Sequence, residues 1–224
     1  LWVDYELQTS IKGLFALEEC NFSDHGANRL GASALMQGLS DGYFVIPYTM
    51  QNYLSDQIQV PHIDTNAPEF DEAEKGVQAE IDRIYNIKGD ESVDSIHKKL
   101  YHIMWDYVGM ARNEAGLKKA LAMLKDIRKE FNEHVRIPGD KEGLNTELDK
   151  AIHLRDFITM GELIAYDALE RNESCGGHFR EESQTEDGEA KRDDEHYMYV
   201  ACWQYPGQEE VPPTLYKEPL NYQY

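Results

Sequence analysis

Positive charge is scarce in this sequence. Its 224 residues include 22 Lys and Arg against 42 Asp and Glu, which gives a formal net charge of −20 at pH 7. Such a surface repels the phosphate backbones of nucleic acids and the headgroups of anionic lipids. We therefore expect no nucleic-acid partner, and we expect any contact with a membrane to depend on a partner protein.

Cysteine is scarce as well. The three cysteines, Cys20, Cys175 and Cys202, lie far apart and form no CxxC pair, which argues against a disulfide framework and a thiolate metal site. The histidines show no metal-ligand spacing, since His97 and His102 are five residues apart and fall on different faces of a helix. We expect a reducing compartment and no metal site.

Long apolar runs are absent. No stretch approaches the roughly 20 residues that span a bilayer, and no basic region followed by a short apolar core marks a signal peptide. The chain opens at Leu1 with the apolar letters LWV and no initiating Met, an opening that favours a piece of a longer protein. Its 41% hydrophobic residues suffice for one substantial core or two modest ones.

The sequence predicts a mainly α, α+β protein in three parts. Residues 1–67 and 68–170 are separated by a polar stretch from Gln57 to Pro68 that contains two prolines, as is typical of an extended linker. From Arg171 the composition becomes rich in Gly, Ser and acidic residues. We expect a helical bundle over 68–170 and a small C-terminal α+β extension over 171–224.

The first part combines one strand with two helices in our prediction. The apolar run GLFAL at 13–17 predicts a buried strand, because it is short and follows turn residues. Small residues from about 28 to 39 predict a helix that lets another group approach closely. A second apolar helix is expected from 43 to 54, interrupted near Pro47.

Apolar residues recur at three- and four-residue spacing through the second part, and this periodicity predicts four helices. The breaks fall at 88–91, 112–116 and 137–143. Beyond them, alternation over 196–204 predicts a strand, and the proline- and tyrosine-rich tail 205–224 is expected to lie extended over a surface. The periodic sets are Val77, Ile81, Ile84; Ile96, Leu100, Ile103, Tyr107; Leu117, Leu121, Leu124, Phe131; and Leu144, Leu148, Ile152.

The segment HGANRLGASAL, from His25 to Leu35, carries the strongest functional signal. Arg29 lies in a loop of small residues just before a helix N-terminus, where a guanidinium and backbone N–H groups favour an anion. An Arg at a helix start is more commonly a surface ion-pair residue. His25 offers a proton donor or a second ligand contact, or it is a loop histidine bonded to backbone.

A second histidine and arginine lie in the loop RNESCGGHFR. His178 and Arg180 read there as an anion site or as a helix C-cap and ion-pair junction, and the C-cap interpretation is favoured.

Three ordered motifs resemble one enzyme family. GLFALEECNFSDHGANRLGASALMQGLSDG resembles the end of the flavin-binding domain in the flavoprotein subunits of succinate dehydrogenase and fumarate reductase. MWDYVGMARNEAGL at 104–117 resembles that family's helical-domain signature, and RNESCGGHFREES at 171–183 resembles its C-terminal loop. The likeness therefore covers nearly the whole chain.

The resemblance implies roles for particular residues. It implies that Arg29 binds the dicarboxylate beside the flavin, with His25 as a further substrate contact. It places Ala34 and Leu35 where backbone groups meet the flavin ring, adds Ser33 to the cofactor-binding residues, and places Glu19 where a carboxylate holds FAD. The chain departs from the family in three places: Glu18 stands where a glycine is usual, the stretch from Glu19 to Arg29 is one residue shorter than in the commoner members, and Cys175 replaces a common arginine.

The resemblance also implies an activity and partners. The expected function is interconversion of succinate and fumarate by hydride transfer with FAD, coupled to an iron–sulfur subunit and a membrane-anchor cytochrome b subunit at the cytoplasmic face of a bacterial plasma membrane. The chain has no GxGxxG fingerprint, so we expect it to hold only part of the FAD site and to be inactive alone. The alternatives are a soluble enzyme of the L-aspartate oxidase type and a helical interaction module without chemistry.

Overall fold

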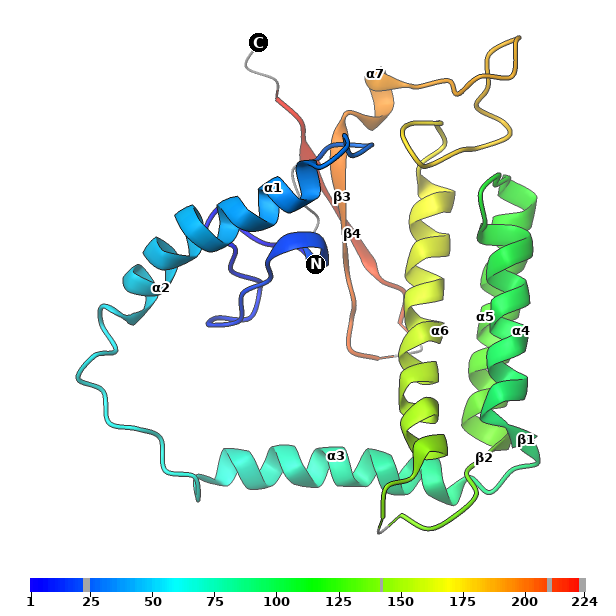
Figure 1. The fold of residues 1–224 in the computed structure, drawn as a ribbon. Coiled ribbons are helices and arrows are strands. Elements are labelled where there is room, and N and C mark those ends of the chain that lie inside the picture. Colours follow the sequence, from blue (N-terminus) through cyan, green and yellow to red (C-terminus); the bar gives the residue numbers. More distant parts are fainter. Residues whose placement is uncertain (22–24, 142, 209–210, 222–224) are drawn as a thin grey trace. The chain divides into compact units, whose positions relative to one another are not determined.

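The computed structural model describes residues 1–21, 25–141, 143–208 and 211–221 (Figure 1). It divides into two compact units, Leu1–Thr65 and Asn66–Tyr224. The expected fold class, mainly α with a small α+β C-terminal part, is confirmed. None of the helices formed by the described residues has the length and apolar composition needed to cross a bilayer.

The first unit is small and built around short helices. In chain order these are the 3-10 turn η1 (Glu18–Cys20), α1 (Ser33–Ser40), the π-helical turn η2 (Asp41–Val45) and α2 (Ile46–Leu54). The N-terminal residues pack against η2 and α2 through a compact apolar cluster of Val3, Leu7, Ala16, Leu17, Val45 and Ile46.

The first unit corrects three details of the prediction. Residues 13–17 form no strand, because their only ladder contact among the described residues is the bridge between Gln8 and Phe15, and only Ala16 is buried. The first helix begins at Ser33 rather than near 28, because Ala32 has a left-handed backbone with φ of 63°. Pro47 is the second residue of α2, directly after the π-helical turn η2, so the helical run continues past the expected interruption with a change from π- to α-helical bonding.

The second unit contains the four helices that the periodicity predicts. They are α3 (Pro68–Asn86), α4 (Val93–Val108), α5 (Glu114–His134) and α6 (Thr146–Glu170), and Figure 1 shows the last three running alongside one another. Ser92, Asn113 and Asn145 cap α4, α5 and α6 by accepting first-turn N–H groups.

The core of the second unit is one continuous apolar cluster. Two short parallel strands, β1 (Glu91–Ser92) and β2 (Val135–Arg136), close the bundle at one end. Most members of the periodic sets lie in this cluster, but Val77 and Leu144 are exposed, and α6 adds Leu154 and Ile158, which the sets did not include. The fully buried members are Ile84, Ile96, Leu117, Leu124, Phe131, Leu154 and Ile158. Burial of these side chains, worth about 1.5–3 kcal/mol each, is the main stabilisation of the bundle.

A hairpin follows the bundle. After the one-turn helix α7 (Asp194–Tyr197), β3 (Tyr199–Gln204) pairs antiparallel with β4 (Thr214–Pro219). The predicted strand therefore begins at 199, after a helical turn, and the tail is not simply extended, since it contributes β4. The Trp203 indole N–H donates to Asp167 Oδ1 at 2.8 Å, and Lys217 pairs with Glu170 at 2.8 Å, so the hairpin is fastened to α6.

Candidate functional site

The turn before α1 brings the expected anion-binding residues to a helix N-terminus. Gly26 has φ of 69° and Ala32 has φ of 63°, so the chain reverses twice before the helix begins. The Ser33 N–H donates to the Leu30 carbonyl. Within the described part of the chain, α1 has no side-chain cap. N–H groups at the start of a helix have no acceptor within the helix, so those of this first turn that are not bonded to the preceding residues, as the Ser33 N–H is, can meet a ligand.

Arg29 and Glu19 meet in this structure. The Arg29 Nη1 atom lies 3.2 Å from Glu19 Oε1, and the two side chains are 51% and 72% exposed. The structure thus joins the residue expected to bind substrate with the residue expected to bind FAD. An exposed pair of this kind is weak, so other ligands can compete for either side chain.

His25 lies beside the first residue of α1. Its Nδ1 is 3.4 Å from the Ser33 hydroxyl, and that hydroxyl donates to the Leu30 carbonyl at 2.7 Å. Because the single hydroxyl proton is directed to Leu30, the Ser33 hydroxyl can accept a hydrogen bond from the Nδ1-protonated tautomer of His25. This contact fixes the imidazole next to the helix N-terminus.

The two residues expected at the flavin ring differ in exposure. Ala34 is buried, whereas Leu35 is 71% exposed. A side chain at Gly31 would meet no atom within 4 Å, so the approach to the first turn of α1 is open within this unit. The same unit exposes further large apolar side chains, namely Leu30, Met36, Leu39, Tyr43, Phe44 and Tyr48. An apolar surface of this extent is typical of a binding face.

Glu18 and Glu19 have different environments. Glu18 has φ of 57°, a left-handed conformation that favours glycine. Its carboxylate lies against Gly38 of α1, where an added methyl group would come within 2.3 Å of Glu18 Oε1. Glu18 is therefore packed on the helix, whereas Glu19 extends toward Arg29. The left-handed backbone also explains why a glycine is the expected residue at position 18.

The C-terminal loop in the second unit has the helix C-cap arrangement. Arg180 is 1% exposed, and its Nη1 atom donates to the carbonyls of Ala168 and Leu169 at 2.9 and 3.2 Å, in the last turn of α6. Its Nε atom donates to Glu182 at 3.1 Å. These bonds satisfy helix carbonyls that lack an intrahelical partner, so Arg180 is a structural residue.

His178 connects this loop to the turn between α4 and α5. Its Nδ1 accepts from Arg112 Nη1 at 2.8 Å, and its Nε2 donates to the Arg171 carbonyl at 2.7 Å. Burial lowers the pKa of His178, and the positive charges of Arg112 and Arg180 lower it further. The imidazole is therefore neutral at pH 7. Arg112 belongs to the helical-domain motif, but nothing in the sequence pairs it with His178.

Arg171 and Glu173 fasten the same loop to the hairpin. Arg171 donates to the carbonyls of Tyr197 and Tyr199 at 3.0 and 2.8 Å, and pairs with Glu173 at 2.7 Å. Glu173, which is 2% exposed, also accepts the Asp193 N–H at 2.9 Å. The loop is therefore a buried polar junction between α5, α6 and β3.

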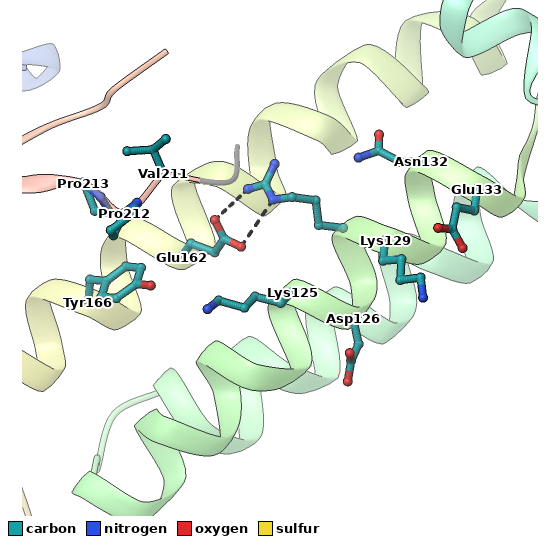
Figure 2. Close-up of a pocket in the computed structure, with 11 residues that line it drawn as sticks. Lys125, Asp126, Lys129, Asn132, Glu133, Glu162, Tyr166, Val211, Pro212 and Pro213 are labelled. Carbon is teal, nitrogen blue, oxygen red and sulfur yellow. Dashed lines mark hydrogen bonds and ion pairs between the residues drawn. The ribbon is translucent and has the colours of Figure 1, made fainter. Parts of the chain in front are cut away.

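A groove of about 570 Å³ lies between α5, α6 and residues 211–213 (Figure 2). Figure 2 shows Lys125, Asp126 and Lys129 on α5, and Glu162 and Tyr166 on α6. Arg128, which is buried, donates to Glu162 at 2.7 Å. Acidic and basic residues alternate along this groove, so its charges balance and it has no preference for an anion.

The comparisons with known proteins agree with the motifs. The family model described as fumarate reductase flavoprotein C-terminal matches residues 97–224, which is more than half of the chain. The chain belongs to this family. It is 32% identical over 190 residues to an uncharacterized FAD-dependent oxidoreductase of Methanocaldococcus jannaschii, an alignment that covers 81% of this chain and 31% of that protein.

Two further relatives place the whole chain in the same family. The fumarate reductase flavoprotein subunit of Haemophilus influenzae is 29% identical, over 88% of this chain and 31% of its own length. A solved quinol-fumarate reductase with menaquinol molecules superposes with a TM-score of 0.79 at 25% identity, over 98% of this chain and 36% of that chain. The chain thus spans about a third of the proteins it matches.

Proposed function

We propose that this chain works as the C-terminal part of a longer flavoprotein that interconverts succinate and fumarate. Membership of the fumarate reductase flavoprotein family supports this reaction over that of an L-aspartate oxidase. The observation that carries the proposal is the arrangement in the first unit. The half-exposed guanidinium of Arg29 lies a few residues before the uncapped N-terminus of α1.

The chemistry of that arrangement suits a dicarboxylate. Arg29 offers parallel N–H donors that match the two oxygens of a carboxylate. His25, held by Ser33, provides a second polar contact close by. Binding a carboxylate at Arg29 fixes the orientation of the carbon–carbon bond that reacts, and this positioning is the chain's own contribution to the rate.

The residues of the first unit also fit FAD. FAD, when bound, supplies the hydride acceptor and donor. Glu19 is exposed and can accept a hydrogen bond from a ribose hydroxyl. The backbone N–H groups of Ala34 and Leu35 suit a flavin carbonyl, since that of Ser33 already donates to Leu30, and the open space at Gly31 gives access. The rest of the cofactor site belongs to other parts of the proposed flavoprotein.

The proposed flavoprotein exchanges electrons with an iron–sulfur subunit. Through it and a membrane-anchor cytochrome b subunit, it is held peripherally at the cytoplasmic face of a bacterial plasma membrane. Two observations support this arrangement. One solved relative is a quinol-fumarate reductase, and the strongly negative charge of the chain disfavours direct binding to anionic lipid.

The test uses two proteins, this chain and a longer flavoprotein that contains it. Both are incubated with FAD and assayed for fumarate reduction with an artificial electron donor. We expect flavin absorbance and turnover in the longer protein only. Replacement Arg29→Ala in the longer protein should lower kcat/KM by about 100-fold or more. Lys12→Ala, a second cation of the same unit, is the matched control.

Two results would overturn the proposal. A longer protein that binds no flavin would favour a helical interaction module without chemistry. A flavin-loaded Arg29→Ala enzyme with unchanged turnover would remove Arg29 from the site.

A further inference from the structure

The ion pair between Arg29 and Glu19 joins two residues with separate proposed ligands. Arg29 is the proposed contact for a dicarboxylate and Glu19 is the proposed contact for FAD, yet their side chains meet at 3.2 Å. While Glu19 accepts from Arg29, one of the donors that would bind a substrate carboxylate is already used. The negative charge of Glu19 also repels an incoming anion.

The position of Glu19 in this pair is fixed by its neighbour. Glu18 is packed on Gly38 of α1, with its backbone in the left-handed region and its N–H directed to Asp41 Oδ2 at 3.4 Å. Asp41 is itself buried. Glu18 is thereby held on the helix, and Glu19 is the carboxylate of this turn that reaches Arg29.

We propose that the Glu19–Arg29 pair is a latch that orders ligand binding. In this scheme, which rests on the proposed function, the latch closes over Arg29 until a ribose hydroxyl of FAD binds Glu19. Arg29 is then released to bind the dicarboxylate. FAD therefore binds before the substrate, and the protein without flavin has a reduced affinity for dicarboxylates.

The expected effect is modest because both side chains are exposed. Exposed ion pairs of this kind change an equilibrium by about two- to five-fold. Removal of the Glu19 charge should therefore raise the dicarboxylate affinity of the flavin-free protein by about that factor. A neutral side chain at Glu18 should not, because Glu18 does not contact Arg29.

The experiment titrates malonate, a dicarboxylate that does not react, into the flavin-free chain of residues 1–224. Malonate binding is followed in every protein by backbone amide shifts, and the state of the guanidinium is followed by the NMR shift of the Arg29 Nε–H group in the proteins that retain Arg29. The proteins compared are the wild type, Glu19→Gln, the matched control Glu18→Gln and the double variant Glu19→Gln with Arg29→Ala. Backbone spectra report whether each variant is folded.

We expect Glu19→Gln to shift the Arg29 Nε–H resonance without ligand and to bind malonate two- to five-fold more tightly than the wild type and Glu18→Gln. Equal affinities in the three proteins, or no malonate binding in Glu19→Gln, would overturn the latch. Malonate binding that survives Arg29→Ala would instead overturn the proposed role of Arg29 in substrate binding.

Discussion

At the scale of single residues, His178 gives a clear pH dependence. Its imidazole accepts from Arg112 and donates to the Arg171 carbonyl, and burial together with Arg112 and Arg180 lowers its pKa below 6.5. Below pH 6.5 the imidazole of residue 178 is protonated in the unfolded chain, whereas in the folded chain it stays neutral to a lower pH. The free energy of unfolding therefore falls as the pH drops from 7.5 toward the pKa of the folded state.

His178→Gln tests this dependence, because Gln keeps one acceptor and one donor but does not titrate. Over pH 7.5 to 5.5, the urea-derived free energy of unfolding should fall less in the variant than in the wild type, with the difference below about 1.4 kcal/mol per pH unit. His196 is the matched exposed histidine, and its pKa is raised by Asp193. His196→Gln should not reduce the loss of unfolding free energy between pH 7.5 and 5.5. The same pH slope in His178→Gln as in the wild type would contradict the proposed effect of His178.

The residues of the candidate site were predictable to different degrees. The motif from His25 to Leu35 identified Arg29 as an anion-binding candidate because a guanidinium before a helix start has a local sequence signature. The different environments of Glu18 and Glu19 could not be predicted, because they depend on a left-handed backbone and on the contact of Glu18 with Gly38. Nor could the sequence pair Arg112 with His178, because 66 residues separate them.

At the scale of elements, the contact between the loop before β1 and the end of α5 depends on Gly89. The Gly89 N–H donates to the Val135 carbonyl at 3.1 Å, and a methyl group at position 89 would lie 1.9 Å from the His134 carbonyl oxygen. Gly89→Ala must therefore displace backbone. We expect a loss of about 2 kcal/mol or more in the free energy of unfolding, measured in urea.

Gly76 is the matched control for Gly89. It is an exposed residue within α3, and an added methyl group there meets no atom within 4 Å. Gly76→Ala should stabilise the protein by about 0.5–1 kcal/mol, because alanine loses less backbone entropy in a helix. Equal and small effects at both positions would show that the close approach at Gly89 does not exist.

The start of α6 depends on Asn145. Its Oδ1 accepts the N–H groups of Glu147 and Leu148 at 3.1 Å, and its Nδ2 donates to the carbonyls of Pro138 and Asp140 at 2.9 and 2.8 Å. Asn145→Ala removes both functions and should cost about 1–2 kcal/mol. Asn145→Asp keeps the cap alone and should cost less. A lower thermal unfolding temperature for Asn145→Asp than for Asn145→Ala would contradict a capping role.

The elements themselves were predictable where the apolar period was long. The four helices of the second unit have several turns each, so the buried positions repeat often enough to define them. The run at 13–17 failed as a strand because Gly13 takes φ of 83° and because, among the residues that the structure describes, the segment pairs only at the bridge between Gln8 and Phe15. The strand β4 was missed because the prolines of the tail are typical of irregular structure. Its pairing with β3 depends on a register across the intervening loop, and the sequence alone does not specify that register.

At the scale of the whole molecule, the two units differ in core size. The first unit buries Val3, Leu7 and Ala16 with few partners, whereas the second buries a continuous cluster along α4, α5 and α6. Local opening is easier where fewer apolar contacts are lost. Hydrogen exchange should therefore be faster by about 10-fold or more in α1 and α2 than in α4–α6. Equal protection in both units would contradict this difference.

The central claim is that Arg29 binds a substrate carboxylate beside a flavin. The most direct measurement is a crystal structure of the flavin-loaded longer protein with malonate or fumarate bound. The account predicts guanidinium nitrogens of Arg29 at about 2.7–3.2 Å from the ligand's carboxylate oxygens. A dicarboxylate bound beside the flavin while Arg29 remains paired with Glu19, or faces away from the ligand, would contradict it.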